Sequence, residues 1–155
     1  MDFKFTEEHQ LIKQTVRDFA EKEIGPLAEE IDVTDLFPRE LFKRMGELGL
    51  LGIPFGEAYG GGGGDYLSLL IALEEIARVS GTVAIILDAQ TSLCCEPIHL
   101  FGTEAQKKKY LPSLVSGEKI GAFGLTEPQA GSDAGATRTR AIREGDEWVI
   151  NGEKI

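Results

Sequence analysis

The chain has 155 residues, of which 42% are hydrophobic and 27% charged, and its formal net charge at pH 7 is -10. These values are ordinary for a globular protein with an adequate core, and they exclude collagen-like and disordered chains. The acidic balance argues against a nucleic-acid or anionic-membrane partner, because both need clustered positive charge. A phosphate-bearing ligand would therefore be held by backbone N–H groups and hydroxyls.

Cysteine and histidine usage points away from disulfide and metal chemistry. The only cysteines, Cys94 and Cys95, are adjacent, which suits reduced, buried thiols better than a disulfide. His9 and His99 are isolated, and no spacing of ligands predicts a metal site. The segment Met1 to Phe5 lacks the basic start and apolar run of a signal peptide, so we expect a cytoplasmic protein.

The residues before 119 have the periodicity of amphipathic helices. Capping and breaking residues set the expected boundaries: Thr6 and Asp65 as N-caps, Pro38 and Gly49 at the start and end of a second helix, and a kink at Gly25 and Pro26. The apolar stripes are Leu11, Ile12, Val16, Phe19, Ala20 and Ile24, then Leu41, Phe42, Met45 and Leu48, then Leu67, Leu70, Ile71, Ile76 and Ala77. Glu74, Glu75 and Arg78 form the polar side of the third helix. The run Gly60 to Gly64 is interpreted as a flexible connection, because no Lys-Ser or Lys-Thr pair follows it.

The segment from 82 to 101 is apolar on nearly every face, which indicates a buried helix. Polar side chains within it, such as Gln90, must either be hydrogen-bonded internally or line a cavity, and the residues alone favour internal bonding. Thr103 and Gln106 then form a capping box for a further helix. The prediction is an all-α domain over residues 1–118.

From Lys119 the pattern becomes strand-like, and residues 119–155 are expected to begin a β domain. Strands are predicted at Ile120 to Thr126, at Thr137 to Arg143 and at Trp148 to Ile150, with a turn at 144–147. Asn151-Gly152 is a strong hairpin signal that requires a strand after it. We therefore expect the polypeptide to continue beyond Ile155, since a hairpin lacking its second strand is unstable.

The sequence AFGLTEPQAGSDAG at residues 122–135 resembles the flavin-binding signature of the acyl-CoA dehydrogenase family. Similar stretches occur along the chain: PRELFKRMGELGLLGI at 38–53, EAYGGGGGDYLSLLIALEEIAR at 57–78, FGTEAQKKKYLPSLVSGEK at 101–119 and GDEWVINGEKI at 145–155. The glycine run and the capping box are unspecific alone, whereas TEPQAGSD in register with the others is specific. The sequence DAQTSLCCEPI at residues 88–98 is similar to that of short-chain, butyryl-type members of the family.

The resemblance implies a mainly α fold, with an up-and-down helical amino-terminal domain followed by the first strands of a β-barrel-like middle domain. It implies FAD-dependent α,β-dehydrogenation of an acyl-CoA thioester to the trans-2-enoyl-CoA, with electrons passed to an electron-transferring flavoprotein. It also implies a homo-oligomer, which is a tetramer in the family, with FAD held across a subunit interface. The proton-abstracting base is expected beyond residue 155, so the 155-residue chain alone is expected to be inactive.

Residue by residue, the resemblance places the cofactor site in the loop. Phe123, Leu125 and Thr126 would lie along the flavin ring, with the Thr126 hydroxyl at its polar edge. Ser132 would bond the FAD pyrophosphate and approach the CoA moiety. Glu127 would fix the loop and not act as the base. The complete cofactor set is Phe123, Gly124, Leu125, Thr126, Glu127, Pro128, Gln129, Ala130, Gly131 and Ser132, and the substrate set is Ser132, Gln90, Thr91, Ser92 and Leu93.

Gln129 departs from the family pattern, which commonly has glycine there, and a positive φ at this position would shift the loop. Two other functions stay open from the sequence: an acyl-CoA oxidase, and a non-catalytic helical interaction module. Rapid reoxidation of reduced flavin by oxygen would indicate the oxidase. The unpartnered Asn151-Gly152 hairpin speaks against the interaction module.

Overall fold

The computed structural model describes residues 4–155. The first three residues, part of the segment on which the signal-peptide expectation rests, lie outside the described residues. The chain divides into two compact units, Met1–Ala122 and Phe123–Ile155. Among the described helices, none has both the length and the apolar character needed to cross a membrane.

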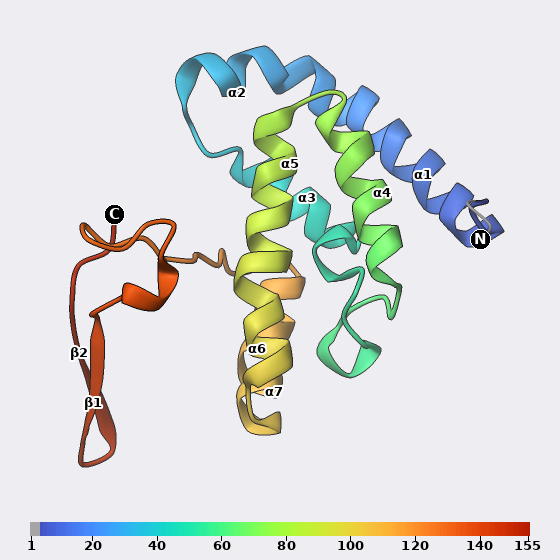
Figure 1. The fold of residues 1–155 in the computed structure, drawn as a ribbon. Helices are drawn as coiled ribbons and strands as arrows, with labels where there is room; N and C mark the ends of the chain where they lie inside the picture. The colour runs from blue at the N-terminus through green and yellow to red at the C-terminus, as the bar shows by residue number, and fades with distance from the viewer. Residues whose placement is uncertain (1–3) are drawn as a thin grey trace. The chain divides into compact units, whose positions relative to one another are not determined.

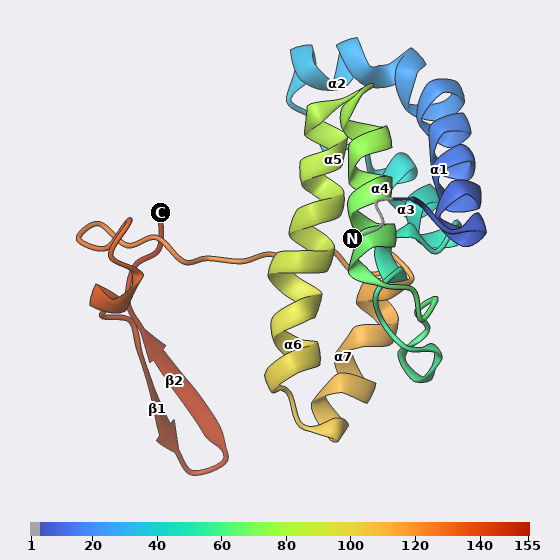
Figure 2. The same ribbon diagram turned by 45° about the vertical axis from the view of Figure 1, so that its right-hand side comes forward.

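The first unit is helical, as predicted. Its α-helices are α1 (Glu7–Phe19), α2 (Ala28–Thr34), α3 (Arg39–Glu47), α4 (Tyr66–Ala77), α5 (Gly81–Asp88), α6 (Glu96–Phe101) and α7 (Glu104–Val115). Helices α1, α4 and α5 lie side by side, α6 continues α5, and α7 runs back beside α6 (Figures 1 and 2). Short π and 3-10 turns join them at Ala20–Ile24, Gly25–Leu27, Leu50–Gly52, Glu57–Tyr59 and Ala89–Cys95.

The helix starts follow from their caps. The hydroxyls of Thr6 and Thr103 and the carboxylate of Asp65 each accept a hydrogen bond from a backbone N–H of the first turn, which confirms the three predicted caps. Helix α3 begins one residue later than predicted, at Arg39, because Pro38 is its N-cap and not its first helical residue. The predicted kink at Gly25 and Pro26 is present, and the axis changes there through consecutive π and 3-10 turns.

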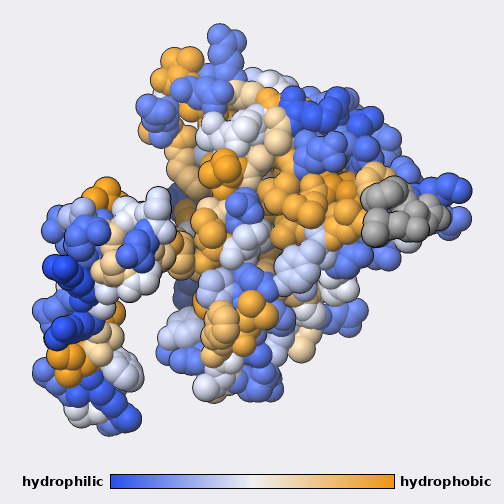
Figure 3. Space-filling view, in the orientation of Figure 1, coloured by the Kyte–Doolittle hydropathy of each residue, from blue (hydrophilic) through white to orange (hydrophobic). Residues whose placement is uncertain are grey.

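Helix α4 buries a face that matches the predicted one only in part, because Ile71 and Ile76 are buried as predicted but other members of the stripe are not. Leu67 and Leu70 are exposed, whereas Glu75 is buried. The reason is electrostatic, because Arg17 of α1 donates two hydrogen bonds to the Glu75 carboxylate and draws it into the contact between α1 and α4. Apolar side chains consequently gather on the surface over α4 (Figure 3). Leu11 on α1 is exposed as well, although it was placed in the apolar stripe of that helix.

The segment 82–101 was predicted to be a buried helix, but only some of its residues are buried. Val83, Leu87, Gln90, Thr91 and Cys95 are buried. Other apolar residues of the same segment are exposed, namely Ile85, Leu93, Leu100 and Phe101. The segment is also not one regular helix, because the π-helical stretch Ala89–Cys95 separates α5 from α6.

The glycine run is a hydrogen-bonded loop, which corrects the prediction of a flexible connection. The N–H groups of Gly62, Gly63 and Gly64 donate to the carbonyls of Gly52, Phe55 and Ile53 at 3.0, 2.8 and 2.8 Å. A Cβ on Gly61 would collide with the Phe55 carbonyl and lie 2.6 Å from the Gly52 oxygen. Glycine is needed here because two backbone segments approach each other closely.

The second unit contains one antiparallel hairpin of β1 (Arg140–Glu144) and β2 (Glu147–Asn151). Gly145 has φ 64° in the turn, as the hairpin requires. Residues 120–126, predicted as a strand, have no strand assignment, because no neighbouring strand pairs with them among the described residues. Asn151-Gly152 is not a type I′ turn either: neither residue has a positive φ, and Gly152 instead packs against Thr139.

Candidate functional site

The predicted flavin segment is held by its backbone, which leaves its side chains exposed. The Leu125 carbonyl accepts a hydrogen bond from Lys154 Nζ at 2.9 Å, and the Thr126 carbonyl accepts one from the Ile155 N–H at 2.9 Å. Phe123 and Leu125 are 50% and 43% exposed. The segment therefore presents apolar surface next to a hydroxyl on Thr126.

Glu127 is buried in the second unit and connects the loop to residues that follow it in the chain. Its carboxylate accepts hydrogen bonds from the Arg138 N–H at 2.6 Å, the Thr139 N–H at 3.0 Å and Lys154 Nζ at 2.9 Å. Hydrogen bonds from Thr139, then from the Arg138 backbone and Lys154, hold the pKa of Glu127 well below its usual range. A carboxylate that is held ionised by its donors is a poor base, because it has little tendency to take up a proton.

Gln129 fits this loop without backbone strain. The only positive φ outside glycine among residues 4–155 is at Asp35, so the glutamine at position 129 does not occupy the left-handed region. Its amide donates to Glu127 Oε2 at 2.6 Å. The backbones of Glu127 and Ala130 exchange two hydrogen bonds of 3.0 Å and close the turn between them.

The loop has the chemical groups that a dinucleotide would need. Thr126 and Ser132 are exposed, and within the described part of the chain their hydroxyls have no hydrogen-bond partner. Lys154, the cation bonded to the loop, is already paired with Glu127. Exposed apolar side chains beside free hydroxyls fit a planar ring with a polar edge, and small residues from Ala130 to Gly135 allow close backbone approach to an anion.

The predicted acyl-pocket residues lie in the π-helical stretch Ala89–Cys95 of the first unit, and their side chains differ in availability. Gln90 and Thr91 are buried, and their polar groups are hydrogen-bonded to backbone atoms of the first unit. Ser92 is half-buried, and Leu93 is 42% exposed. Thus Ser92 and Leu93 keep surface that a ligand could contact.

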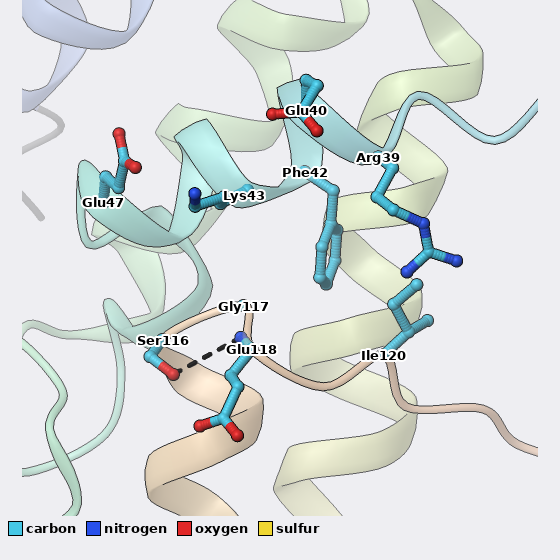
Figure 4. Close-up of a pocket in the computed structure, with 9 residues that line it drawn as sticks. All are labelled: Arg39, Glu40, Phe42, Lys43, Glu47, Ser116, Gly117, Glu118 and Ile120. Atoms are coloured by element: carbon cyan, nitrogen blue, oxygen red, sulfur yellow. Dashed lines mark hydrogen bonds between the residues drawn. The ribbon is translucent and has the colours of Figure 1, made fainter.

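A groove of about 400 Å³ on the first unit contains none of the predicted site residues. It lies between α3 and the turn that follows α7, where the Glu118 N–H donates to Ser116 Oγ (Figure 4). Its lining mixes both signs of charge and includes Arg39, Glu40, Phe42, Lys43, Glu47, Ser116, Gly117, Glu118 and Ile120. Such a surface selects no single class of ligand.

The sequence reasoning missed two residues that shape these sites. Lys154 ties the end of the chain to Glu127 and Leu125, and Gly121 accepts no side chain because a Cβ would collide with Cys94. A glycine inside a predicted strand signals close backbone approach, so Gly121 could have been found. No local signal marked Lys154, because its partners are distant in sequence.

The described residues form a helical unit followed by a loop and a two-stranded hairpin. The profile of the acyl-CoA dehydrogenase N-terminal domain matches residues 6–118, and that of the acyl-CoA dehydrogenase middle domain matches residues 122–155. The chain belongs to the acyl-CoA dehydrogenase family.

Individual relatives agree with the profiles. The chain is 57% identical over 155 residues to the short-chain specific acyl-CoA dehydrogenase of Clostridium acetobutylicum, covering 100% of this chain and 41% of the relative. The solved butyryl-CoA dehydrogenase of Megasphaera elsdenii superimposes with a TM-score of 0.92 at 46% identity, covering 100% of this chain and 42% of the other. A structure described as the electron transferring flavoprotein of Acidaminococcus fermentans gives 0.96 at 49% identity, covering 100% and 41%. The chain thus spans about two fifths of the length of these proteins.

Proposed function

We propose that the full-length protein is an FAD-dependent dehydrogenase that converts a short acyl-CoA thioester to its trans-2-enoyl-CoA. The observation that supports this proposal is the structure of the loop after residue 122. The Glu127 carboxylate is hydrogen-bonded to Arg138, Thr139 and Lys154. Phe123, Leu125, Thr126 and Ser132 are exposed and can contact a ligand. The short-chain preference is supported by the named relatives in Clostridium and Megasphaera.

Each loop residue has a proposed task. Phe123 and Leu125 lie against the flavin ring, the Thr126 hydroxyl bonds its polar edge, and Ser132 bonds the pyrophosphate and approaches CoA. When bound, FAD supplies the acceptor for the hydride that leaves the β carbon of the substrate. Glu127 keeps Arg138 and Thr139 beside the loop and takes no part in proton abstraction.

In the first unit, Ser92 and Leu93 are the favoured contacts for the acyl chain, since Gln90 and Thr91 already have partners. Transfer of electrons to an electron-transferring flavoprotein, a cytoplasmic location and assembly into a homo-oligomer belong to the same proposal.

Anaerobic titration of the full-length protein with butyryl-CoA tests the proposal. We expect bound FAD in the purified protein and loss of its visible absorbance as substrate is added. Slow reoxidation by oxygen, with fast reoxidation by an electron-transferring flavoprotein, is expected of a dehydrogenase, and the reverse order would indicate an oxidase. Absence of flavin, or flavin that no acyl-CoA reduces, would refute the proposal.

Thr126→Ala tests the placement of the flavin. Removing one hydroxyl hydrogen bond should raise the FAD dissociation constant by about tenfold or slow flavin reduction to a similar degree. Thr137→Ala is the matched control, because Thr137 is an exposed threonine of the same unit outside the predicted set. Equal behaviour of the two variants would remove Thr126 from the site.

A further inference from the structure

Gln90 connects the π-helical stretch Ala89–Cys95 to the segment by which the chain leaves the first unit. Its side-chain NH₂ donates to the Leu114 carbonyl at 2.8 Å and to the Lys119 carbonyl at 3.1 Å. Its carbonyl oxygen accepts from the Gly121 N–H at 2.7 Å. Both donors of the amide are therefore used, and the side chain is 1% exposed.

The same segment is pressed against Cys94, one helical turn after Gln90. A Cβ on Gly121 would collide with Cys94 Sγ and lie 2.6 Å from Cys94 Cβ. Gly121 thus has room for no side chain, and its backbone rests directly on the helix. Burial raises the pKa of the Cys94 thiol, more than the neighbouring Ala122 backbone lowers it.

Little else among the described residues holds residues 119–122, here called the exit segment. Helix α7 ends at Val115, and the Lys119 N–H donates to the Ser113 carbonyl at 2.8 Å. Beyond Lys119, the hydrogen bond from Gly121 to Gln90 and the contact between the Ala122 backbone and the Cys94 thiol hold the exit segment. Phe123, the first residue of the predicted flavin segment, follows directly in the chain.

We propose that Gln90 is a positioning residue for the flavin site, which it serves by fixing the exit segment to the π-helical stretch that carries Ser92 and Leu93. This role replaces the direct substrate contact predicted for Gln90, and it rests on the proposed dehydrogenase function. One side chain then fixes the exit segment, from which the predicted flavin segment continues in the sequence. An unpaired Gly121 N–H would let the exit segment move, because a buried donor seeks another partner or water.

Gln90→Met in the full-length protein is the test, since methionine keeps a similar length and removes all of these hydrogen bonds. The FAD dissociation constant should rise by about tenfold or more, whereas the relative rates with acyl-CoA substrates of different length should stay as in the wild type. Ser68→Ala is the control: Ser68 is buried in the same unit and outside the predicted site sets, and its hydroxyl donates to Asp65 Oδ1. It is expected to leave the FAD dissociation constant unchanged.

A second readout does not depend on activity. The rate at which a small maleimide modifies Cys94, followed by tandem mass spectrometry, should rise in Gln90→Met because the exit segment no longer covers the thiol. It should stay low in Ser68→Ala, and Cys95, which is fully buried, should stay unmodified in both.

The outcomes separate this inference from the proposed function. Wild-type protein that lacks FAD or is not reduced by butyryl-CoA would refute the function itself. With a functional wild type, unchanged FAD affinity and unchanged Cys94 modification in Gln90→Met would overturn the positioning role. A changed chain-length preference with unchanged FAD affinity would overturn it too, and would assign Gln90 to the substrate pocket.

Discussion

Glu75 keeps its charge although it is buried, because cations from two helices surround it. Arg17 binds the carboxylate at 2.8 and 2.9 Å, Arg78 binds it at 2.8 Å, and Lys13 lies 3.6 Å away. Hydrogen bonds from Arg17 outweigh the effect of burial and, together with Arg78, lower the pKa of Glu75 to about 2. Both Arg17 and Arg78 reach partly into solvent, so the group is an ion pair at the edge of the core.

Glu75→Gln should lower the free energy of unfolding at neutral pH by about 1–3 kcal/mol, because the charge-assisted hydrogen bonds are lost. The folded-state pKa lies below the unfolded value of 4.5, so the stabilisation is present above that value and is lost as pH falls toward about 2. Urea denaturation at neutral pH and at about pH 3 measures the effect. The difference between wild type and variant should shrink in acid. The exposed neighbour provides the control Glu74→Gln, and a difference that does not depend on pH would contradict the ion-pair interpretation.

At the scale of elements, the loop at 52–64 shows how backbone contacts can decide a residue type. Gly61→Ala is expected to lower the free energy of unfolding by about 1–3 kcal/mol, since its Cβ meets fixed carbonyl oxygens and not a mobile side chain. Gly62→Ala in the same run is the control, because the nearest atom to its Cβ would be the Ile53 oxygen at an ordinary 3.8 Å. Equal stability of the two variants in thermal denaturation would show that the loop adapts.

Elements with local causes could be predicted from the sequence, and elements with distant causes could not. The caps at Thr6, Asp65 and Thr103 depend on residues within one turn, and all three were predicted correctly. The strand expected at 120–126 needed a neighbouring strand, which no local pattern supplies. The compact glycine run was missed for the same reason, because its hydrogen-bond partners Gly52, Ile53 and Phe55 precede the donor glycines by up to eleven residues.

The buried face of α4 was predicted only in part, at Ile71 and Ile76, because its sequence is apolar almost all round and periodicity could not select a side. Within the candidate site, the loop-fixing role of Glu127 was anticipated, and the structure supplies its donors from Arg138, Thr139 and Lys154. That network spans 27 residues of sequence between Glu127 and Lys154. Only the fold could show it. The cofactor and substrate residues themselves stay predictions.

At the scale of the whole molecule, the two units differ in what stabilises them. The first unit has a core that includes Phe42, Met45, Leu51, Ile76 and Leu87. Every residue of β1 and β2 is exposed, including Trp148 at 64%. A two-stranded hairpin without a buried face is marginal in water, so the helices and the hairpin should not unfold together in a polypeptide of residues 1–155.

Trp148 makes this difference measurable, because it is the one tryptophan of the sequence. Far-ultraviolet circular dichroism should report a cooperative transition of the helices in urea. Tryptophan emission should already be that of a solvated indole in the absence of denaturant and should change little through the transition. Trp148→Phe gives the tyrosine background. Coincident transitions by both probes would show that the hairpin is stabilised as part of the same cooperative structure, and would contradict the independence of the two units.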